Sequence, residues 1–280
     1  MPSVAEPKTV FQHPWRIASL IGVVANVTYN FAYSRVGSPT PTVADVSNAY
    51  PTLFTPAGYA FAIWGLIYGA TLVYAVMALM PKQLGVLMHD RVAPWLLLTN
   101  ALASLWVSLF SQAELGPSTL IIAATLVCAV VMYSMVSDHL VSEHLSHGWR
   151  VPFGLWLGWL SVATLANFNI AFSAAGWSGF PLSEPLWTSV LLLFAALVAS
   201  GVGALFLDPV VPFVVAWAAL AIAVGHFQES AWVAFVAMLV AVKSAFSGLR
   251  LSLFSSLPMP RAQREHIEAM LRFVPARTRA

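Results

Sequence analysis

Phe61, Trp64 and Tyr68 stand at positions i, i+3 and i+7 of an apolar segment, a spacing that puts all three rings on one face of a helix. Indole and phenol groups combine a flat apolar surface with a single hydrogen-bonding group. Such a stripe can line a cavity for a rigid, planar, hydrophobic molecule. It can also serve as packing between helices, which is the more ordinary use of aromatic residues in a bundle.

A second stripe runs through a later apolar segment, where Trp156, Trp159, Ala163 and Asn167 follow the spacing i, i+3, i+7 and i+11. The small side chain of Ala163 leaves room either for a ligand or for close helix packing. A side-chain amide without a partner in hydrocarbon costs several kcal/mol. We therefore expect the asparagines of the apolar segments to face the protein interior and to bond with each other, with the backbone or with a ligand. These asparagines are Asn26, Asn30, Asn100 and Asn167.

The composition predicts the environment of these stripes. The chain has 280 residues, of which 59% are apolar and 9% are charged. Soluble domains carry about 25% charged residues, so the sequence predicts an all-α integral membrane protein whose surroundings are the lipid bilayer. A helix needs about 20 apolar residues to cross the hydrocarbon core, and eight segments predict eight transmembrane helices. They are Trp15–Arg35, Thr55–Met80, Pro94–Ala113, Pro117–Val136, Pro152–Ala174, Leu186–Leu207, Pro209–His226 and Ser230–Leu253.

The basic residues predict the orientation. With eight spans, both termini share a side with the second, fourth and sixth loops, and that side collects eleven of the thirteen lysines and arginines. Arg35 is alone on the other side, and Lys243 lies within the last segment. Because basic loops stay in the cytoplasm, we expect both termini inside, in a membrane such as the bacterial inner membrane. Loop 36–54 is then external, either as a lid or as a linker, and the basic tail 256–280 is cytoplasmic.

Lys243 is a separate functional candidate. A charge at membrane depth is costly and often marks a substrate path, although a lysine can also extend its ammonium group toward the interface. A lysine that forms a Schiff base with retinal needs a deep carboxylate, which no spanning segment offers. Lys243 therefore suggests either a permease for an anionic substrate or a snorkelling side chain.

Other chemistry has little support in the sequence. No nucleophile triad, phosphate-binding loop or nucleic-acid patch is visible, and the single cysteine, Cys128, excludes a disulfide within the chain. A group of histidines and carboxylates near the fourth loop suggests a metal site or a contact to haem, but a solvated loop is the simpler interpretation. The group consists of Asp138, His139, Glu143, His144 and His147.

The aromatic stripes resemble the TspO/MBR family, the tryptophan-rich sensory proteins related to the mitochondrial translocator protein. In that family the second helix follows a proline and carries a Phe-x-x-Trp-x-x-x-Tyr pattern, which Pro56 and the stripe from Phe61 to Tyr68 match. The run from Trp159 to Asn167 is similar to the family's Trp-x-Ser-x-Ala-Thr-x-x-Asn pattern.

The third segment resembles the family in part. It keeps Asn100 and Ser104, but Ala103 occupies a position where family members have tryptophan, and Trp106 offers an indole from a neighbouring angle of the helix. The resemblance covers about residues 1–175 and implies a five-helix bundle there. The remainder divides into a three-helix transmembrane extension at 176–255 and the basic tail at 256–280.

The resemblance also implies a function. It suggests a sensor or transporter for porphyrin-like, haem-like or other flat hydrophobic molecules, needing no cofactor or metal and able to form a homodimer. The alternatives are a permease that uses the added helices and Lys243, and an enzyme that degrades tetrapyrroles, for which the sequence shows no acid–base pair. The implied ligand-binding residues are Phe61, Trp64, Tyr68, Asn100, Ser104, Trp156, Trp159, Ala163 and Asn167.

Overall fold

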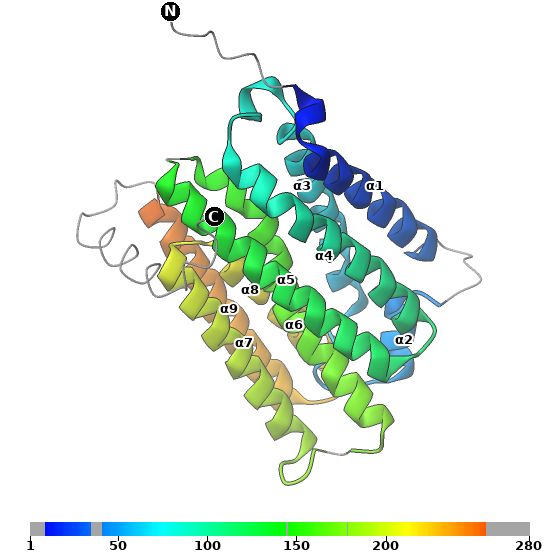
Figure 1. Cartoon of the computed structure of the whole chain (residues 1–280). Coiled ribbons are helices and arrows are strands. Elements are labelled where there is room, and N and C mark those ends of the chain that lie inside the picture. Colours follow the sequence, from blue (N-terminus) through cyan, green and yellow to red (C-terminus); the bar gives the residue numbers. More distant parts are fainter. Residues whose placement is uncertain (1–8, 35–40, 144, 178, 256–280) are drawn as a thin grey trace, which may run out of the picture.

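The computed structural model describes residues 9–34, 41–143, 145–177 and 179–255 (Figure 1). Within these residues all regular secondary structure is helical. The α-helices are α1 (Pro14–Ser34), α2 (Val43–Ala49), α3 (Ile63–Met77), α4 (Leu87–Ser111), α5 (Leu115–Ser142), α6 (Val151–Ala174), α7 (Glu184–Phe206), α8 (Val210–Gly225) and α9 (Ala231–Ser255). Short 3-10 helices are η1 (Val10–Gln12), η2 (Gly58–Ala62), η3 (Pro81–Gln83) and η4 (His147–Arg150).

Five of the long helices contact one another in a closed ring. Going around it, α1 packs against α4, α4 against α5, α5 against α6, α6 against α3, and α3 against α1. Helices α7, α8 and α9 pack together as a second group, which meets the ring chiefly where α8 lies against α6 and η2. In Figure 1 the blue helix α1 and the orange helix α9 lie on opposite flanks.

The contact between α6 and α8 depends on two glycines. A Cβ atom on Gly158 would lie 2.8 Å from Cβ of Val214, and one on Gly154 would lie 3.1 Å from Cβ of Val210. Small residues at such positions let the backbones of two membrane helices approach closely. The sequence Gly154-x-x-x-Gly158 therefore determines where the second group joins the ring.

Arg16 of α1 connects helices on the side of the ring formed by α1, α3 and α4. Although it is only 1% exposed, its guanidinium donates to both carboxylate oxygens of Asp90 on α4, each at 2.7 Å. It also donates to the carbonyls of Ala78, Gln83 and Val86 at 2.8–2.9 Å. Such a bidentate, hydrogen-bonded pair compensates the cost of burying the charges, so Arg16 joins α1 to α4 and to the end of α3.

Several helix boundaries differ from the predicted ones. Helix α4 begins at Leu87, so Pro94 lies inside it and not at its start. The added turns form because Met88 and Val92 are fully buried, and this packing offsets the hydrogen bond that proline cannot make. Helix α5 runs on to Ser142, which places His139 in its last turn and not in a loop.

Helix length and composition support a membrane protein. In the described part of the chain, six helical segments are long and apolar enough to cross a bilayer: Gly58–Met77, Leu87–Ser111, Leu115–Ser142, His147–Ala174, Glu184–Phe206 and Ala231–Leu253. Helix α8 is apolar but has only 16 residues. Helix α1 has the length but contains Arg16, Asn26 and Asn30 and is not among the six. The count of eight spans thus stays a prediction.

Candidate functional site

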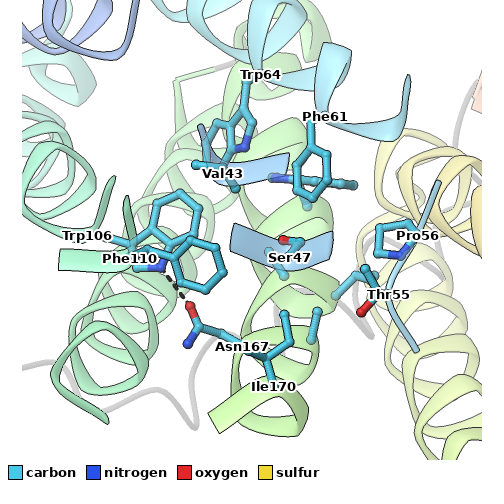
Figure 2. A pocket seen from close by; sticks show the side chains of 14 residues that line it. Val43, Ser47, Thr55, Pro56, Phe61, Trp64, Trp106, Phe110, Asn167 and Ile170 are labelled. Carbon is cyan, nitrogen blue, oxygen red and sulfur yellow. Dashed lines mark hydrogen bonds between the residues drawn. The ribbon is translucent and has the colours of Figure 1, made fainter. Parts of the chain in front are cut away.

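A small cavity lies inside the ring, between α3, α4 and α6 (Figure 2). Its volume is about 30 Å³, which is room for a water molecule or two. Figure 2 shows side chains from several elements directed toward the same space. The walls include Phe61 of η2, Trp64 of α3, Trp106 and Phe110 of α4, and Trp159, Ala163 and Asn167 of α6.

Trp64 is the centre of the aromatic cluster around this cavity. Its ring centroid lies 5.4 Å from that of Tyr68 in a stacked arrangement and 5.8 Å from that of Trp106. The rings of Trp156 and Trp159 meet it edge-on at 5.5 and 6.2 Å. The two aromatic stripes of the sequence therefore converge on one indole, with ring separations typical of favourable aromatic pairs.

The indole N–H groups of the cluster differ in their partners. Trp156 Nε1 donates to Thr71 Oγ1 at 2.9 Å, and Trp106 Nε1 donates to Asn167 Oδ1 at 2.8 Å. Trp159 is 1% exposed, yet its Nε1 has no acceptor among the described residues. Buried N–H groups are rarely left unpaired, so Trp159 offers a donor on the cavity wall for an acceptor that is not part of these helices.

Asn167, in the cavity wall, connects three helices. Its Oδ1 accepts the bond from Trp106 on α4. Its Nδ2 donates to Thr119 Oγ1 at 2.7 Å and to Ser118 Oγ at 3.2 Å, both on α5. The amide thus fixes the orientation of Trp106, which supplies an indole on α4 near the position where Ala103 interrupts the family pattern.

Asn100 and Ser104 do not reach the cavity wall. They meet the asparagines of α1, because Asn26 donates to Asn100 Oδ1 at 2.9 Å and accepts from Ser104 Oγ at 2.8 Å. Asn30 donates to Asn26 Oδ1 at 2.7 Å. This polar cluster links α1 to α4, and membrane helices use such amides for association.

Of the remaining predicted residues, some line the cavity and others lie behind its wall. Phe61 and Ala163 line the cavity directly. Tyr68 and Trp156 form a layer behind Trp64 and are not part of the wall. Two of the wall positions that the sequence interpretation missed, Phe110 and Ile170, extend the stripes by one helical turn, as i+4 from Trp106 and i+3 from Asn167. That spacing is the signal that would have found them.

The cover of the cavity comes from the loop before α3. Val43 and Ser47 of α2, followed by Thr55 and Pro56, close one side of the cavity. Helix α2 packs against α4 and has its N-cap at Thr42. The loop that precedes α3 therefore contains a short helix, and part of it covers the cavity.

Lys243 lies apart from the cavity. Its ammonium donates to the Ala196 carbonyl at 3.3 Å and to the Ser200 hydroxyl, both on α7. Its side chain is exposed. The described partners are neutral groups, so Lys243 joins α9 to α7.

The histidines form no metal centre within the described residues. His139 Nδ1 lies 2.6 Å from Glu143 Oε1, and no group of three or more histidine, cysteine or carboxylate side chains in the described ranges could hold a metal ion. His144 lies outside those ranges.

Comparison with known proteins gives one finding. A family model described as TSPO-like protein matches residues 16–249, a range that includes the five-helix ring and extends through α7 and α8 into α9. No curated protein and no solved structure matches the chain.

Proposed function

The chain belongs to the TSPO-like family, and from this premise we propose that it binds a flat, hydrophobic, porphyrin-like molecule at the cavity between α3, α4 and α6. It acts in a membrane as a ligand-binding protein, with a role in sensing or transporting that ligand. The convergence of both aromatic stripes on Trp64 carries the proposal.

The chemistry of the wall supports a binding role. The side chains that line the cavity are rings, aliphatic groups, one amide and two hydroxyls, with no ionisable group among the described ones. Flat apolar walls with sparse polar groups suit a planar guest. Trp159 Nε1 has no acceptor among the described residues, so it can donate to a carbonyl, carboxylate or ring nitrogen of the ligand. Acid–base catalysis has no such support at this wall.

The size of the cavity means that the ligand must open it. Sites for drug-sized molecules occupy about 300–1,000 Å³, whereas this cavity has about 30 Å³. Helices α4 and α6 are held by buried contacts along their length, but α2 has only seven residues. We therefore propose that α2, together with Thr55 and Pro56, moves aside when the ligand binds.

The proposed orientation has both termini in the cytoplasm of a bacterial cell. Arg16, Arg150 and Arg250 lie toward that end of the bundle, while Glu184 and Glu229 lie at the opposite end. This distribution follows the positive-inside rule. The cavity and its cover then lie toward the external surface.

A titration with protoporphyrin IX tests the proposed function. We expect saturable quenching of tryptophan fluorescence in purified protein. Changing Trp64→Phe or Trp159→Phe should raise Kd by about two- to tenfold, because each change removes ring contact worth about 0.5–1.5 kcal/mol. Trp15, which is 56% exposed on α1, provides the control: Trp15→Phe should leave Kd unchanged. Absence of saturable quenching, or equal Kd values in all three variants, would refute the proposal.

A further inference from the structure

Residues 52–60, here called the mouth segment, connect α2 to α3 and include Thr55 and Pro56 of the cavity wall. The segment is not α-helical, and only its last three residues enter η2. Its backbone groups therefore lack the internal pairing of a helix and need partners elsewhere. Where those partners lie determines what keeps the mouth segment in place.

One partner comes from the start of α7. The N–H of Leu53 donates to Glu184 Oε1 at 3.0 Å. Leu53 is buried although Glu184 is exposed, so a carboxylate at the outer end of α7 holds a buried part of the mouth segment. A hydrogen bond to a charged acceptor is stronger than one between neutral groups.

Three further partners come from α8 and the residue after it. The N–H of Ala57 donates to the Ala221 carbonyl at 3.1 Å. Trp217 Nε1 donates to the Ala60 carbonyl at 3.1 Å, and the ring nitrogen Nε2 of His226 contacts the Thr55 carbonyl at 2.9 Å. Each bond reaches a different part of the mouth segment, so α8 holds it along most of its length.

The approach of α8 is close enough to require a glycine. A Cβ atom on Gly225 would lie 3.3 Å from the backbone nitrogen of Ala57, tighter than ordinary contact. His226 is positioned in turn by Glu229, whose Oε2 lies 2.8 Å from its Nδ1. The end of α8 is thus shaped to lie against the mouth segment.

The remaining hydrogen bonds of the mouth segment join residues close together in the sequence. Thr55 N–H donates to the Thr52 carbonyl, and Ala60 N–H donates to the Ala57 carbonyl. Among the described residues, the hydrogen bonds that join the mouth segment to groups distant in the sequence go to α7, to α8 or to the residue that follows α8. The ring that contains the cavity contributes a local bond, from the N–H of Ile63 at the start of α3 to the Ala60 carbonyl.

We propose that the group α7–α9 positions the mouth of the cavity and thereby sets the rate at which a ligand is admitted. Glu184, Trp217 and His226 are its positioning residues. They touch the mouth segment and do not line the cavity. This inference rests on the proposed function, since it concerns access to the same cavity. Whether α7–α9 hold the mouth segment in place can nevertheless be measured without a ligand.

A matched pair of tryptophan variants gives the test. Trp217→Phe removes the indole donor to the mouth segment, while Trp232→Phe removes a comparable donor to Ser189 within the α7–α9 group. In lipid nanodiscs, hydrogen exchange read by mass spectrometry should accelerate about three- to tenfold in peptides covering residues 52–60 in Trp217→Phe. The control Trp232→Phe should exchange there like the wild type. His226→Leu should act like Trp217→Phe, and the exposed Glu184→Gln offers a third variant if either fails to fold.

Stopped-flow quenching by protoporphyrin IX supplies the second readout. The association rate should rise severalfold in Trp217→Phe and His226→Leu and stay unchanged in Trp232→Phe. Equal exchange at residues 52–60 in all variants would overturn the proposal. Faster exchange without a change in association rate would overturn its claim on ligand admission. If wild-type protein shows no porphyrin quenching, the proposed function fails, while the exchange data still decide whether α7–α9 hold the mouth segment.

Discussion

Asn167 shows how one side chain can serve both stability and the cavity. Its amide accepts from the indole of Trp106 and donates to the hydroxyls of Ser118 and Thr119. Three buried groups on two other helices thus depend on one residue. The sequence motif indicated that Asn167 matters, and the hydrogen bonds indicate a physical reason: it holds an indole of the cavity wall in position.

Asn167→Leu should therefore lower stability and weaken porphyrin binding together. Leaving buried polar groups unpaired costs about 1–3 kcal/mol, and a freed Trp106 no longer presents a fixed ring to the ligand. Unfolding in mixed micelles and the protoporphyrin Kd measure the two effects. Asn169→Leu is the control two residues further on, because the Asn169 Nδ2 has no partner among the described residues. If both variants lose the same stability, Asn167 has no special role.

At the scale of elements, α2 depends on a capping box. Thr42 Oγ1 accepts from the N–H of Asp45 at 3.2 Å, and Asp45 Oδ2 accepts from the N–H of Thr42 at 2.8 Å. These are the reciprocal bonds that start a helix efficiently. A helix of seven residues has little other intrinsic stability, so the cap helps to keep the cover of the cavity folded.

Thr42→Ala should fray α2. We expect faster hydrogen exchange in peptides covering residues 43–49, because the change removes the Thr42 hydroxyl, which accepts from the N–H of Asp45 and donates to Asp45 Oδ2. Asn48→Ala is the control, since it removes an exposed amide from the same helix and leaves the cap intact. Alanine favours a helix more than asparagine does, so this variant should exchange no faster than the wild type. Equal exchange in the two variants would show that the cap does not hold the cover.

Low pH should also destabilise α2. Hydrogen bonds from Thr42 hold the pKa of Asp45 below its ordinary value, which is about 3.9. Because the pKa of Asp45 is lower in the folded state, its carboxylate stabilises the folded state at pH values above the ordinary pKa. This contribution is lost as the pH falls through the folded-state pKa. Exchange in α2, corrected for intrinsic rates, should stay constant from about pH 7 to pH 5 and increase below about pH 4. Constant exchange down to about pH 2 would contradict a link between the ionisation of Asp45 and the stability of α2.

At the scale of the whole molecule, Asp208 joins the two groups of helices. It lies between α7 and α8, is 2% exposed, and accepts a hydrogen bond from Tyr133 of α5 at 2.6 Å. Arg150, at the start of α6, forms an ion pair with the same oxygen at 3.1 Å. The carboxylate thus connects the turn of the second group to two helices of the ring.

A double-mutant cycle can measure this connection. Arg150→Met should destabilise the protein by about 3–5 kcal/mol, because it leaves Asp208 buried without its cation. The double variant Arg150→Met/Asp208→Asn should be less destabilised than the sum of the single variants, with a coupling of about 0.5–3 kcal/mol. Unfolding monitored by circular dichroism in micelles provides the free energies. Strict additivity would mean that the ion pair does not couple the groups.

The sequence by itself determined the fold class and the inward direction of the polar residues. Few charges and long apolar segments allow only membrane helices, because hydrocarbon offers no partner to an unpaired backbone group. The same penalty directs Asn26 and Asn167 inward, whatever their partners. Helical periodicity also placed Trp64 and Trp159 on defined faces, and the family motif identified the chain as TSPO-like, which the family model confirmed.

Only the tertiary structure decided which of those inward groups meet. Periodicity fixes an angle around one helix axis but not the rotation or depth of neighbouring helices. The structure therefore joined Asn100 to Asn26, away from the cavity, and brought Trp106 to Trp64 instead. The four bonds from α7, α8 and His226 to the mouth segment likewise connect residues over 130 positions apart in the sequence, and no local pattern records such pairing.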